Sequence, residues 1–565
     1  MRLARKALFL VFASGMVLAQ ANPPATPLAS TASVSDELKQ LREAVAQQQK
    51  LMLQQQQQMA QQQQQMTEQQ QKIDALQKAL EAKTSGAPHV ENASLNTTNT
   101  SSGPITQSDV EKPKESPLSF RIGGTDFTPG GFVDFENIFR STNTGNVSAT
   151  NFWAIPFSNT VPGHLTEYRA TGQYSRFNLK TSTHFKGSDV MGYIEGDFNG
   201  NDAASVFVTS NSHTMRLRLY WLDLRHGSWE FLGGSTWGLE TPNRVGVSPM
   251  PADLSLTLGE DAQTHIGINY TRAAEFRAAY HFSNKFVWAV GLQNPQQFIG
   301  QQQNGTNEVA FPNAFNAQLG SQLDPATTPG APNLAPDILT KFAYDTGTSH
   351  KFHFEAGGLA TSAKVTVLPT VPNTSFTSHT KWEGGFMGAT NYELFKNFRL
   401  LAQGMWGPGV GRYIIGMGPQ LVIVPVPAVS GGTCTNLGGC DVHISPVHAG
   451  DVLVGAETQL GSSQFGFYYG GAYFQRNTFP DITSATQPNI GFGGIQQVGS
   501  TFQNRALQEG SIDWTQTFWK NPQYGAVLLV TQASYVTRAT WFVAAGAPKN
   551  AHLTMGYVSL RYVLP

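Results

Sequence analysis

Charged residues in three short segments are spaced so that they could act together on an ion. On an extended strand, side chains two positions apart point to the same face. Basic residues beside acidic ones would create a transverse electric field that favours and orients ionic solutes. The same charges could instead form ion pairs that brace the surrounding wall, and the two roles are compatible. The set comprises Arg176, Lys180, Glu195, Asp197, Arg216 and Arg218, with Tyr220 expected on the same face.

The elements that would carry these charges belong to a long region, 117–565, in which apolar and polar residues alternate. In residues 131–140, Val133, Phe135 and Phe139 fall on one face, and the charged residues fall on the other. Alternation of this kind fits either a soluble β protein or a membrane barrel whose polar face lines water. The clearest stretches are 131–140, 176–185, 191–198, 215–221, 286–290, 351–355, 525–536 and 552–564.

Loop lengths favour the membrane barrel. Short turns are expected at 186–189, 283–285, 396–397, 461–463 and 520–523, and long loops at 141–168, 240–263, 295–336 and 425–448. Short turns that alternate with long loops are typical of barrels whose two rims face different compartments. The sequence therefore predicts an all-β transmembrane antiparallel β-barrel of about 16 strands, with 18 as the alternative. The loop 240–263 is a candidate for folding into the lumen.

Composition agrees with this fold class. Charged residues make up 13% of the 565 residues, a low content that suits a structure with one face in lipid. The net charge of -1 gives no reason to expect a nucleic acid partner. Tryptophans near the expected strand ends fit interfacial girdles, although the core of a soluble domain could also hold them. They are Trp221, Trp229, Trp237, Trp382, Trp406, Trp519 and Trp541.

The N-terminus has the pattern of a secretory signal peptide at residues 1–21. Basic residues precede an apolar run, and Ala19-Gln20-Ala21 supplies a small-x-small cleavage pattern. A retained anchor helix is the alternative, but the apolar run is short for a membrane span. A flexible leader is expected at 22–34.

A strict seven-residue repeat follows at 35–83 and predicts an α-helical coiled coil. Glutamine occupies the middle d positions, so a disordered Gln-rich tract is the alternative. A rod of this kind needs partner helices, which predicts a homo-oligomer. A polar linker, 84–116, separates it from the barrel. The coiled-coil core would be Leu38, Val45, Met52, Met59, Met66, Ile73 and Leu80.

The two cysteines of the chain, Cys434 and Cys440, are expected to form a loop disulfide, because the protein is predicted to be exported. A metal site would need further ligands, and only His443 and His448 lie near. The sequence lacks the common hydrolase, nucleotide-binding and metalloprotease motifs. No metal, cofactor or enzyme activity is therefore expected.

Several short motifs resemble the barrel of DcaP-like porins. They are 175–183, 193–198, 216–218, 233–237 and 411–413. The resemblance covers most of the mature chain and implies a trimer of 16-stranded barrels with a periplasmic coiled coil, associated with uptake of small anionic solutes such as dicarboxylates. The C-terminus departs from the common aromatic ending of such barrels. Tyr562 and Leu564 keep the alternation, but the last residue is Pro565.

These observations predict a porin of the bacterial outer membrane that allows passive diffusion of small hydrophilic solutes, with the coiled coil in the periplasm. Its partners would be outer-membrane lipid, other copies of the chain, and periplasmic structures such as peptidoglycan. The alternative is an envelope tether in which the barrel only anchors the coiled coil. A secreted adhesin or soluble β protein is a third interpretation, which would keep its apolar faces inside.

Overall fold

The computed structural model describes 116–145, 148–200, 214–250, 265–301, 308–326, 330–347, 351–371, 375–414, 418–494, 503–543 and 545–565. The predicted signal peptide, leader, coiled coil and nearly all of the linker lie outside these residues. Within the described part, no helix is long and apolar enough to cross a membrane.

The main sheet is an antiparallel ring closed between its last strand and its first long strand. Backbone pairing runs in order from β2 through β4–β13, β16, β17, β20 and β21 to β22, and β22 pairs back with β2 from Val563↔Phe132 to Met555↔Arg140. The sheet contains 18 strands, but the short β1 and β3 only add to β2, so the closed barrel has 16. The predicted fold class and strand number are confirmed for the barrel.

The strands of the ring and its additions have the following bounds. They are β1 Phe120–Ile122, β2 Thr125–Arg140, β3 Glu167–Thr171, β4 Arg176–Phe185, β5 Ser188–Asp197, β6 Arg216–His226, β7 Trp229–Ser235, β8 Ala274–Ser283, β9 Phe286–Gln293, β10 Asp337–Thr346, β11 Phe352–Val367, β12 Thr377–Phe395, β13 Phe398–Pro408, β16 His448–Leu460, β17 Ser463–Phe474, β20 Asn504–Asn521, β21 Gly525–Thr540 and β22 Asn550–Val563.

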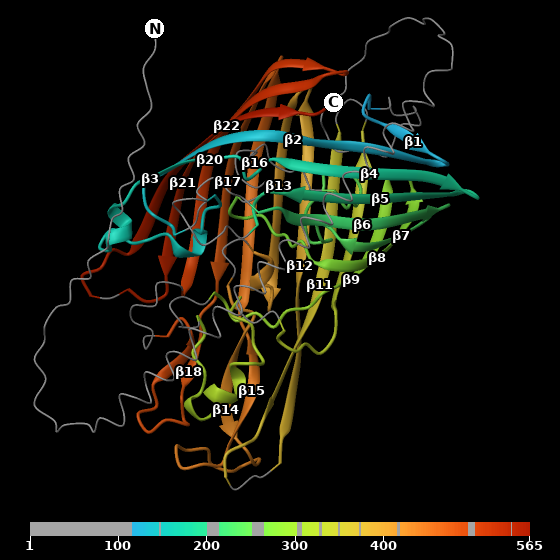
Figure 1. Cartoon of the computed structure of the whole chain (residues 1–565). Helices are drawn as coiled ribbons and strands as arrows, with labels where there is room; N and C mark the ends of the chain where they lie inside the picture. Colours follow the sequence, from blue (N-terminus) through green and yellow to red (C-terminus); the bar gives the residue numbers. More distant parts are fainter. Residues whose placement is uncertain are drawn as a thin grey trace, which may run out of the picture. The chain divides into compact units, whose positions relative to one another are not determined.

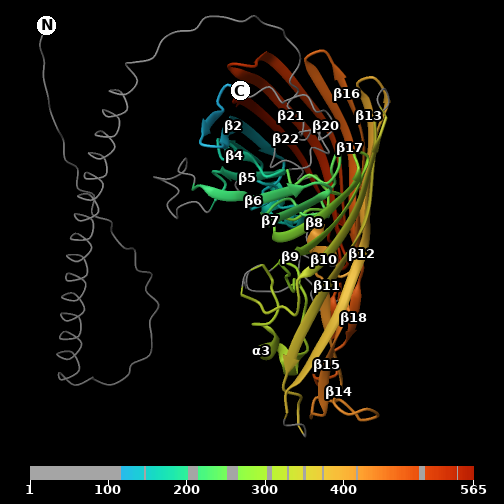
Figure 2. The same cartoon turned by 90° about the vertical axis from the view of Figure 1, so that its right-hand side faces the viewer.

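The connections hold the remaining elements. Two hairpins, β14–β15 and β18–β19, lie at the end of the barrel opposite the C-terminus (Figures 1 and 2). Their strands are β14 Leu421–Pro427, β15 Cys440–Pro446, β18 Asn477–Pro480 and β19 Asn489–Phe492, and the helical turns are η1 Phe152–Ala154, η2 Val161–His164, η3 Asn313–Phe315, α3 Asn316–Leu319 and η4 Gly411–Tyr413. Cys434 and Cys440 form the predicted disulfide at the turn of the β14–β15 hairpin.

Exposed apolar side chains cover the outer face and the charged side chains of β2 face inward, which agrees with the predicted alternation, although the inner face also carries apolar residues such as Ile138. On β2, Val133, Phe135 and Phe139 are exposed, while Asp134 and Arg140 are buried inside the ring. A soluble protein would bury its apolar residues, so the outward apolar face identifies a surface made for lipid. The interpretation as a soluble β protein is therefore not supported.

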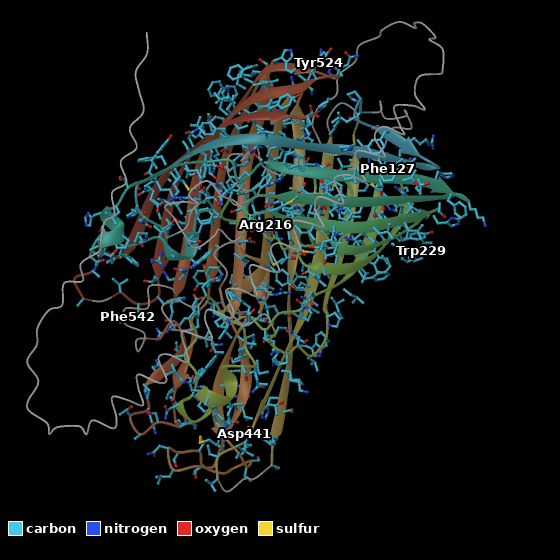
Figure 3. The ribbon with its side chains drawn as sticks, viewed as in Figure 1. Phe127, Arg216, Trp229, Asp441, Tyr524 and Phe542 are labelled. Carbon is cyan, nitrogen blue, oxygen red and sulfur yellow. A yellow bond between two sulfur atoms is a disulfide. The ribbon has the colours of Figure 1, made fainter. Side chains whose placement is uncertain are left out.

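The two rims differ as the sequence predicted. Each of the five predicted short turns joins neighbouring strands at one rim, and the four predicted long loops join strands at the other. Figure 3 shows the short-turn rim, marked by Phe127, Trp229 and Tyr524, and the hairpin end, marked by Asp441. The last strand keeps its pairing through Val563, and the Ser116 hydroxyl donates a hydrogen bond to the Pro565 carbonyl at 2.9 Å. The unusual C-terminal residue therefore leaves the closing strand intact.

The tryptophan prediction is correct in part. Trp229, Trp382, Trp406 and Trp519 are exposed on the outer face, as girdle residues would be. Trp221 and Trp237 are instead buried inside the ring, where they form one cluster with Leu219. Placing these two at the membrane interface was wrong, because strand parity changes at a bulge in β6 and because Trp237 begins a loop that turns inward.

A charge placed on the outer face should destabilise the barrel. Phe467 lies outward near the middle of β17 and is 49% exposed. We expect Phe467→Arg to lower the free energy of unfolding by about 2–4 kcal/mol in lipid, because an arginine near the midplane must leave water. Equilibrium unfolding in phospholipid vesicles measures this change. Leu437→Arg, at the exposed tip of the β14–β15 hairpin, is the control, and an equal loss there would contradict the assigned lipid face.

Candidate channel lumen and constriction

The connection between β7 and β8, residues 236–273, turns into the lumen. Its first half is held by side chains of β10 and β11. The ammonium group of Lys341 donates to the Thr241 carbonyl at 2.7 Å, and the Asn243 amide donates to the Glu355 carboxylate at 3.0 Å. The predicted inward placement of 240–263 is therefore confirmed for 240–250, while 251–264 lie outside the described residues. We call 236–250 together with 265–273 the inner segment.

Both halves of the inner segment also contact strands on the other side of the ring. Arg244 forms a two-pronged ion pair with Glu457 of β16, with nitrogen–oxygen distances of 2.8 and 2.7 Å. The Ile266 amide donates to Glu509 of β20 at 3.0 Å. Bidentate arginine–carboxylate pairs combine charge with fixed geometry. The inner segment is thus fastened to β10 and β11 on one side of the lumen and to β16 and β20 on another.

Two glycines allow this close approach. A Cβ atom on Gly470 of β17 would lie 1.6 Å from the Ile266 carbonyl oxygen. Gly267 adopts a φ of +91°, and a Cβ there would lie 2.1 Å from the Val452 carbonyl oxygen. Any larger residue must displace the backbone of one partner. The contact between the inner segment and the wall therefore depends on glycine on both sides.

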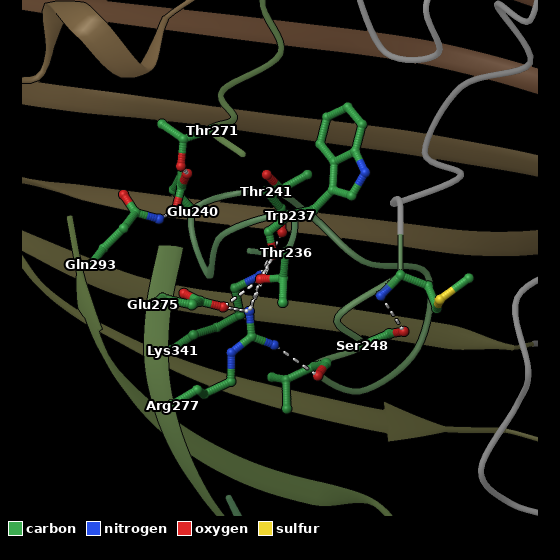
Figure 4. Close-up of polar contacts among 12 residues, drawn as sticks. Thr236, Trp237, Glu240, Thr241, Ser248, Thr271, Glu275, Arg277, Gln293 and Lys341 are labelled. Atoms are coloured by element: carbon green, nitrogen blue, oxygen red, sulfur yellow. Dashed lines mark hydrogen bonds and ion pairs between the residues drawn. The ribbon is translucent and has the colours of Figure 1, made fainter. Parts of the chain in front are cut away.

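The base of the inner segment is a buried polar network (Figure 4). The Arg277 guanidinium of β8 donates to the Trp237 carbonyl at 3.1 Å and to the Val247 carbonyl at 3.3 Å, and it pairs with Glu275. The Glu240 carboxyl accepts a hydrogen bond from Thr271, and burial raises its pKa above the ordinary value. The network therefore fastens Trp237 and Val247 of the inner segment to Arg277 of β8.

The predicted charged residues of β4–β6 lie on the inner face, where most of them form ion pairs. Arg218 contacts Glu195 at 2.8 Å and Asp197 at 3.1 Å, and Arg216 contacts Asp197 at 2.6 Å. The Arg218 side chain is fully buried, whereas that of Arg216 is 30% exposed. This geometry supports the bracing role for Arg218 and leaves the Arg216 side chain partly exposed on the inner face.

The prediction that Tyr220 faces the lumen was wrong. A register shift between Glu195 and Gly196 leaves Arg218 as an extra residue in β6, and a bulge of this kind reverses the alternation that follows it. Tyr220 is 45% exposed on the face of Leu217 and Leu222, and Trp221 is buried inside. The Trp221 ring stacks on the Tyr193 ring, with their centroids 5.3 Å apart.

Two further cations belong to this wall. Lys180, which the sequence singled out, lies on the inner face of β4 opposite Tyr193, and Arg169 lies opposite the inward-facing Ile138 on β3. Neither has an acidic partner among the described residues. The sequence analysis missed Arg169, because β3 is short and its alternation spans only a few residues. The pairing of β3 with β2 places Arg169 on the inner face.

The opposite wall is acidic. Asp451 and Glu457 of β16, with Glu509 and Asp513 of β20, have buried inward side chains, and of these Glu457 is paired with Arg244. The strands β3–β6 thus carry basic residues together with acidic partners such as Glu195 and Asp197, whereas the described inward charges of β16 and β20 are acidic. An uneven distribution of charge of this kind produces a field across a lumen, with the inner segment lying within it.

Filling the space above Gly470 should loosen the inner segment. We expect Gly470→Ala to displace Ile266 from the wall, so that single-channel currents become noisier and their amplitude changes. Gly471→Ala is the matched control, because a Cβ at that neighbouring glycine would have its nearest contact at 3.8 Å. Identical current traces from the two variants would show that the glycine contact does not hold the segment.

Comparison with known proteins supports the architecture. No family model matches the chain, and no curated protein matches it. The crystal structure of the outer membrane channel DcaP of Acinetobacter baumannii is similar with a TM-score of 0.51 and 16% identity, covering 79% of this chain and 100% of that chain. An anion-selective porin from Comamonas acidovorans matches with a TM-score of 0.41 and 10% identity, covering 78% of this chain and 100% of that one. The chain thus has the fold of the DcaP channel, and its resemblance to DcaP-like porins is confirmed at the level of the fold.

Proposed function

We propose that this protein is an outer-membrane porin through which small hydrophilic solutes diffuse passively. The observation that carries the proposal is the closed 16-strand ring with an apolar outer face and a charged inner face. An inner face of this kind suits a lumen that holds water and ions. The inner segment would then narrow the path and place polar groups beside the passing solute. A diffusion channel of this kind requires no catalytic group and no cofactor.

We further propose that the channel prefers small anions, including dicarboxylate-like solutes. Arg169 and Lys180 support the preference because they lie on the inner face without an acidic partner among the described residues. Arg216 adds a further positive charge, which is paired with Asp197 and partly exposed. The acidic groups of β16 and β20 would repel an anion toward this basic wall. The lumen would therefore guide an anion along β3–β6.

A homo-oligomer completes the proposal, with a trimer as the favoured form. The predicted coiled coil at 35–83 would join the chains and extend into the periplasm, where peptidoglycan is a possible contact. The envelope tether is the weaker alternative, because a barrel that serves only as an anchor has no need of a charged inner face.

Solute flux tests the function directly. Vesicles that contain the folded mature protein are expected to swell in isotonic arabinose and in isotonic sodium succinate, whereas vesicles with the heat-denatured protein should not. Light scattering after rapid mixing measures the swelling rate. Absence of swelling with protein that is folded and inserted would overturn the proposal.

Charge reversal of Arg169 and Lys180 tests the anion preference. We expect Arg169→Glu combined with Lys180→Glu to shift the reversal potential under a potassium chloride gradient toward that of a cation channel, because both changes act on the same wall. Lys285→Glu, in the short turn between β8 and β9, is the control for net charge. If the control shifts the potential as far as the double variant, the basic wall does not set selectivity.

A further inference from the structure

The outer face carries an aromatic and basic group of residues that the channel does not use. It lies at the long-loop ends of β13, β17, β20 and β21, and we call it the rim cluster. The Trp406 and Tyr473 rings stack with centroids 6.4 Å apart, and Tyr473 meets Trp541 edge to face at 6.1 Å. The Trp406 ring lies over Gly450, where a Cβ would come within 2.2 Å of it. Because β16 has a glycine at this position, the three rings form one continuous aromatic surface.

Two arginines lie at the end of this aromatic surface. The Arg505 guanidinium lies 5.9 Å from the centroid of the Trp541 ring. Arg505 is the extra residue of a bulge between Asn504 and Ala506, and a bulge can redirect a side chain away from the regular alternation. The Cγ of Arg476 and the ring of Trp541 each come within 3.0 Å of the position that a Cβ would take on Gly493. The Arg505 guanidinium and the aliphatic part of Arg476 therefore lie near the same indole ring.

These arginines have exposed side chains and no carboxylate partner in the described part of the chain. The neighbouring segment 495–502, which lies outside the described residues, contains no aspartate or glutamate. Cations that have no counter-charge in the described part of the chain favour a negatively charged partner, most strongly at a surface of low polarity. The rim cluster is therefore complementary to an anion that comes from outside the chain.

The height of the cluster places that anion at the membrane surface. From the short turn at Asn397 to Trp406, β13 rises by about 23 Å if each residue adds about 3.3 Å along a strand tilted by about 40°. This rise is close to the height of about 25 Å for the apolar band of such barrels. Exposed aromatics mark the other boundary at the short-turn rim, where Trp229 and Trp519 lie. The rim cluster thus coincides with the headgroup level of the outer leaflet.

We propose that the rim cluster binds a phosphorylated glycolipid of the outer leaflet. Arg476 and Arg505 would hold its phosphate group, since guanidinium groups match phosphate oxygens in pairs. Trp406, Tyr473 and Trp541 would pack against its sugar and upper acyl carbons, as amphipathic rings do at an interface. The proposal rests on the membrane placement of the barrel, and it does not depend on ion passage through the lumen.

Lipid binding to the full-length protein tests this assignment. Native mass spectrometry of the detergent-solubilised oligomer measures binding of bisphosphorylated lipid A, its phosphate-free form and dioleoyl phosphatidylglycerol. We expect the first to bind best, and the double variant Arg476→Ala, Arg505→Ala to bind it about tenfold more weakly. The control is Lys549→Ala, an exposed cation in the loop before β22, which should bind like the wild type.

Each other outcome contradicts the proposal. Equal binding of the phosphate-free lipid would show that the arginines do not recognise phosphate. Equal binding of phosphatidylglycerol would exclude a glycolipid site. A double variant that changes the number of subunits would assign the rim cluster to a subunit interface. Channel conductance of the double variant should equal that of the wild type, so a failure of lipid binding and a failure of the channel function are distinguishable.

Discussion

Pairing of β22 with β2 is the interaction on which the rest of this structure depends. A strand edge in hydrocarbon would leave backbone amides and carbonyls without partners, and only closure of the sheet removes both edges. The pairing extends over most of β22 and includes an inward ion pair between Arg561 and Asp134 at 2.7 Å. Closure then divides every strand into one face for lipid and one for the lumen. The positions of the apolar outer face, the charged residues of the inner face and the inner segment all follow from this division.

The inner face combines mechanical and electrostatic roles. Ion pairs such as Arg218–Asp197 and Arg244–Glu457 link neighbouring strands or fasten the inner segment to the wall. Charges held in this way have fixed positions, so they can shape a field without reorganising when an ion passes. Lys180 and Arg169 have no such partner among the described residues, so in the proposed channel they would be available to a solute. In the proposed channel, bracing and guidance would therefore belong to different residues of the inner face.

The sequence predicted much of the barrel because its physics is local. Residues that are close together in the chain determine the alternation along β2 and β4, the short turns and the disulfide. The bulge at Arg218 could not be predicted, since it depends on register with β5, and the errors at Tyr220 and Trp221 follow from it. The anchors of the inner segment join residues as distant as Ile266 and Glu509. Only the closed fold brings such pairs together, so their contacts were beyond a reading of local pattern.

The recording of single channels in planar bilayers tests the central account most directly. Folded wild-type protein should insert and give discrete, reproducible current steps in symmetric potassium chloride, because the proposed function requires a lumen that conducts ions. Resistance of the unheated protein to SDS would confirm folding in the same sample. If protein that is folded and inserted carries no current, the lumen is closed, and the barrel acts as an anchor instead of a channel.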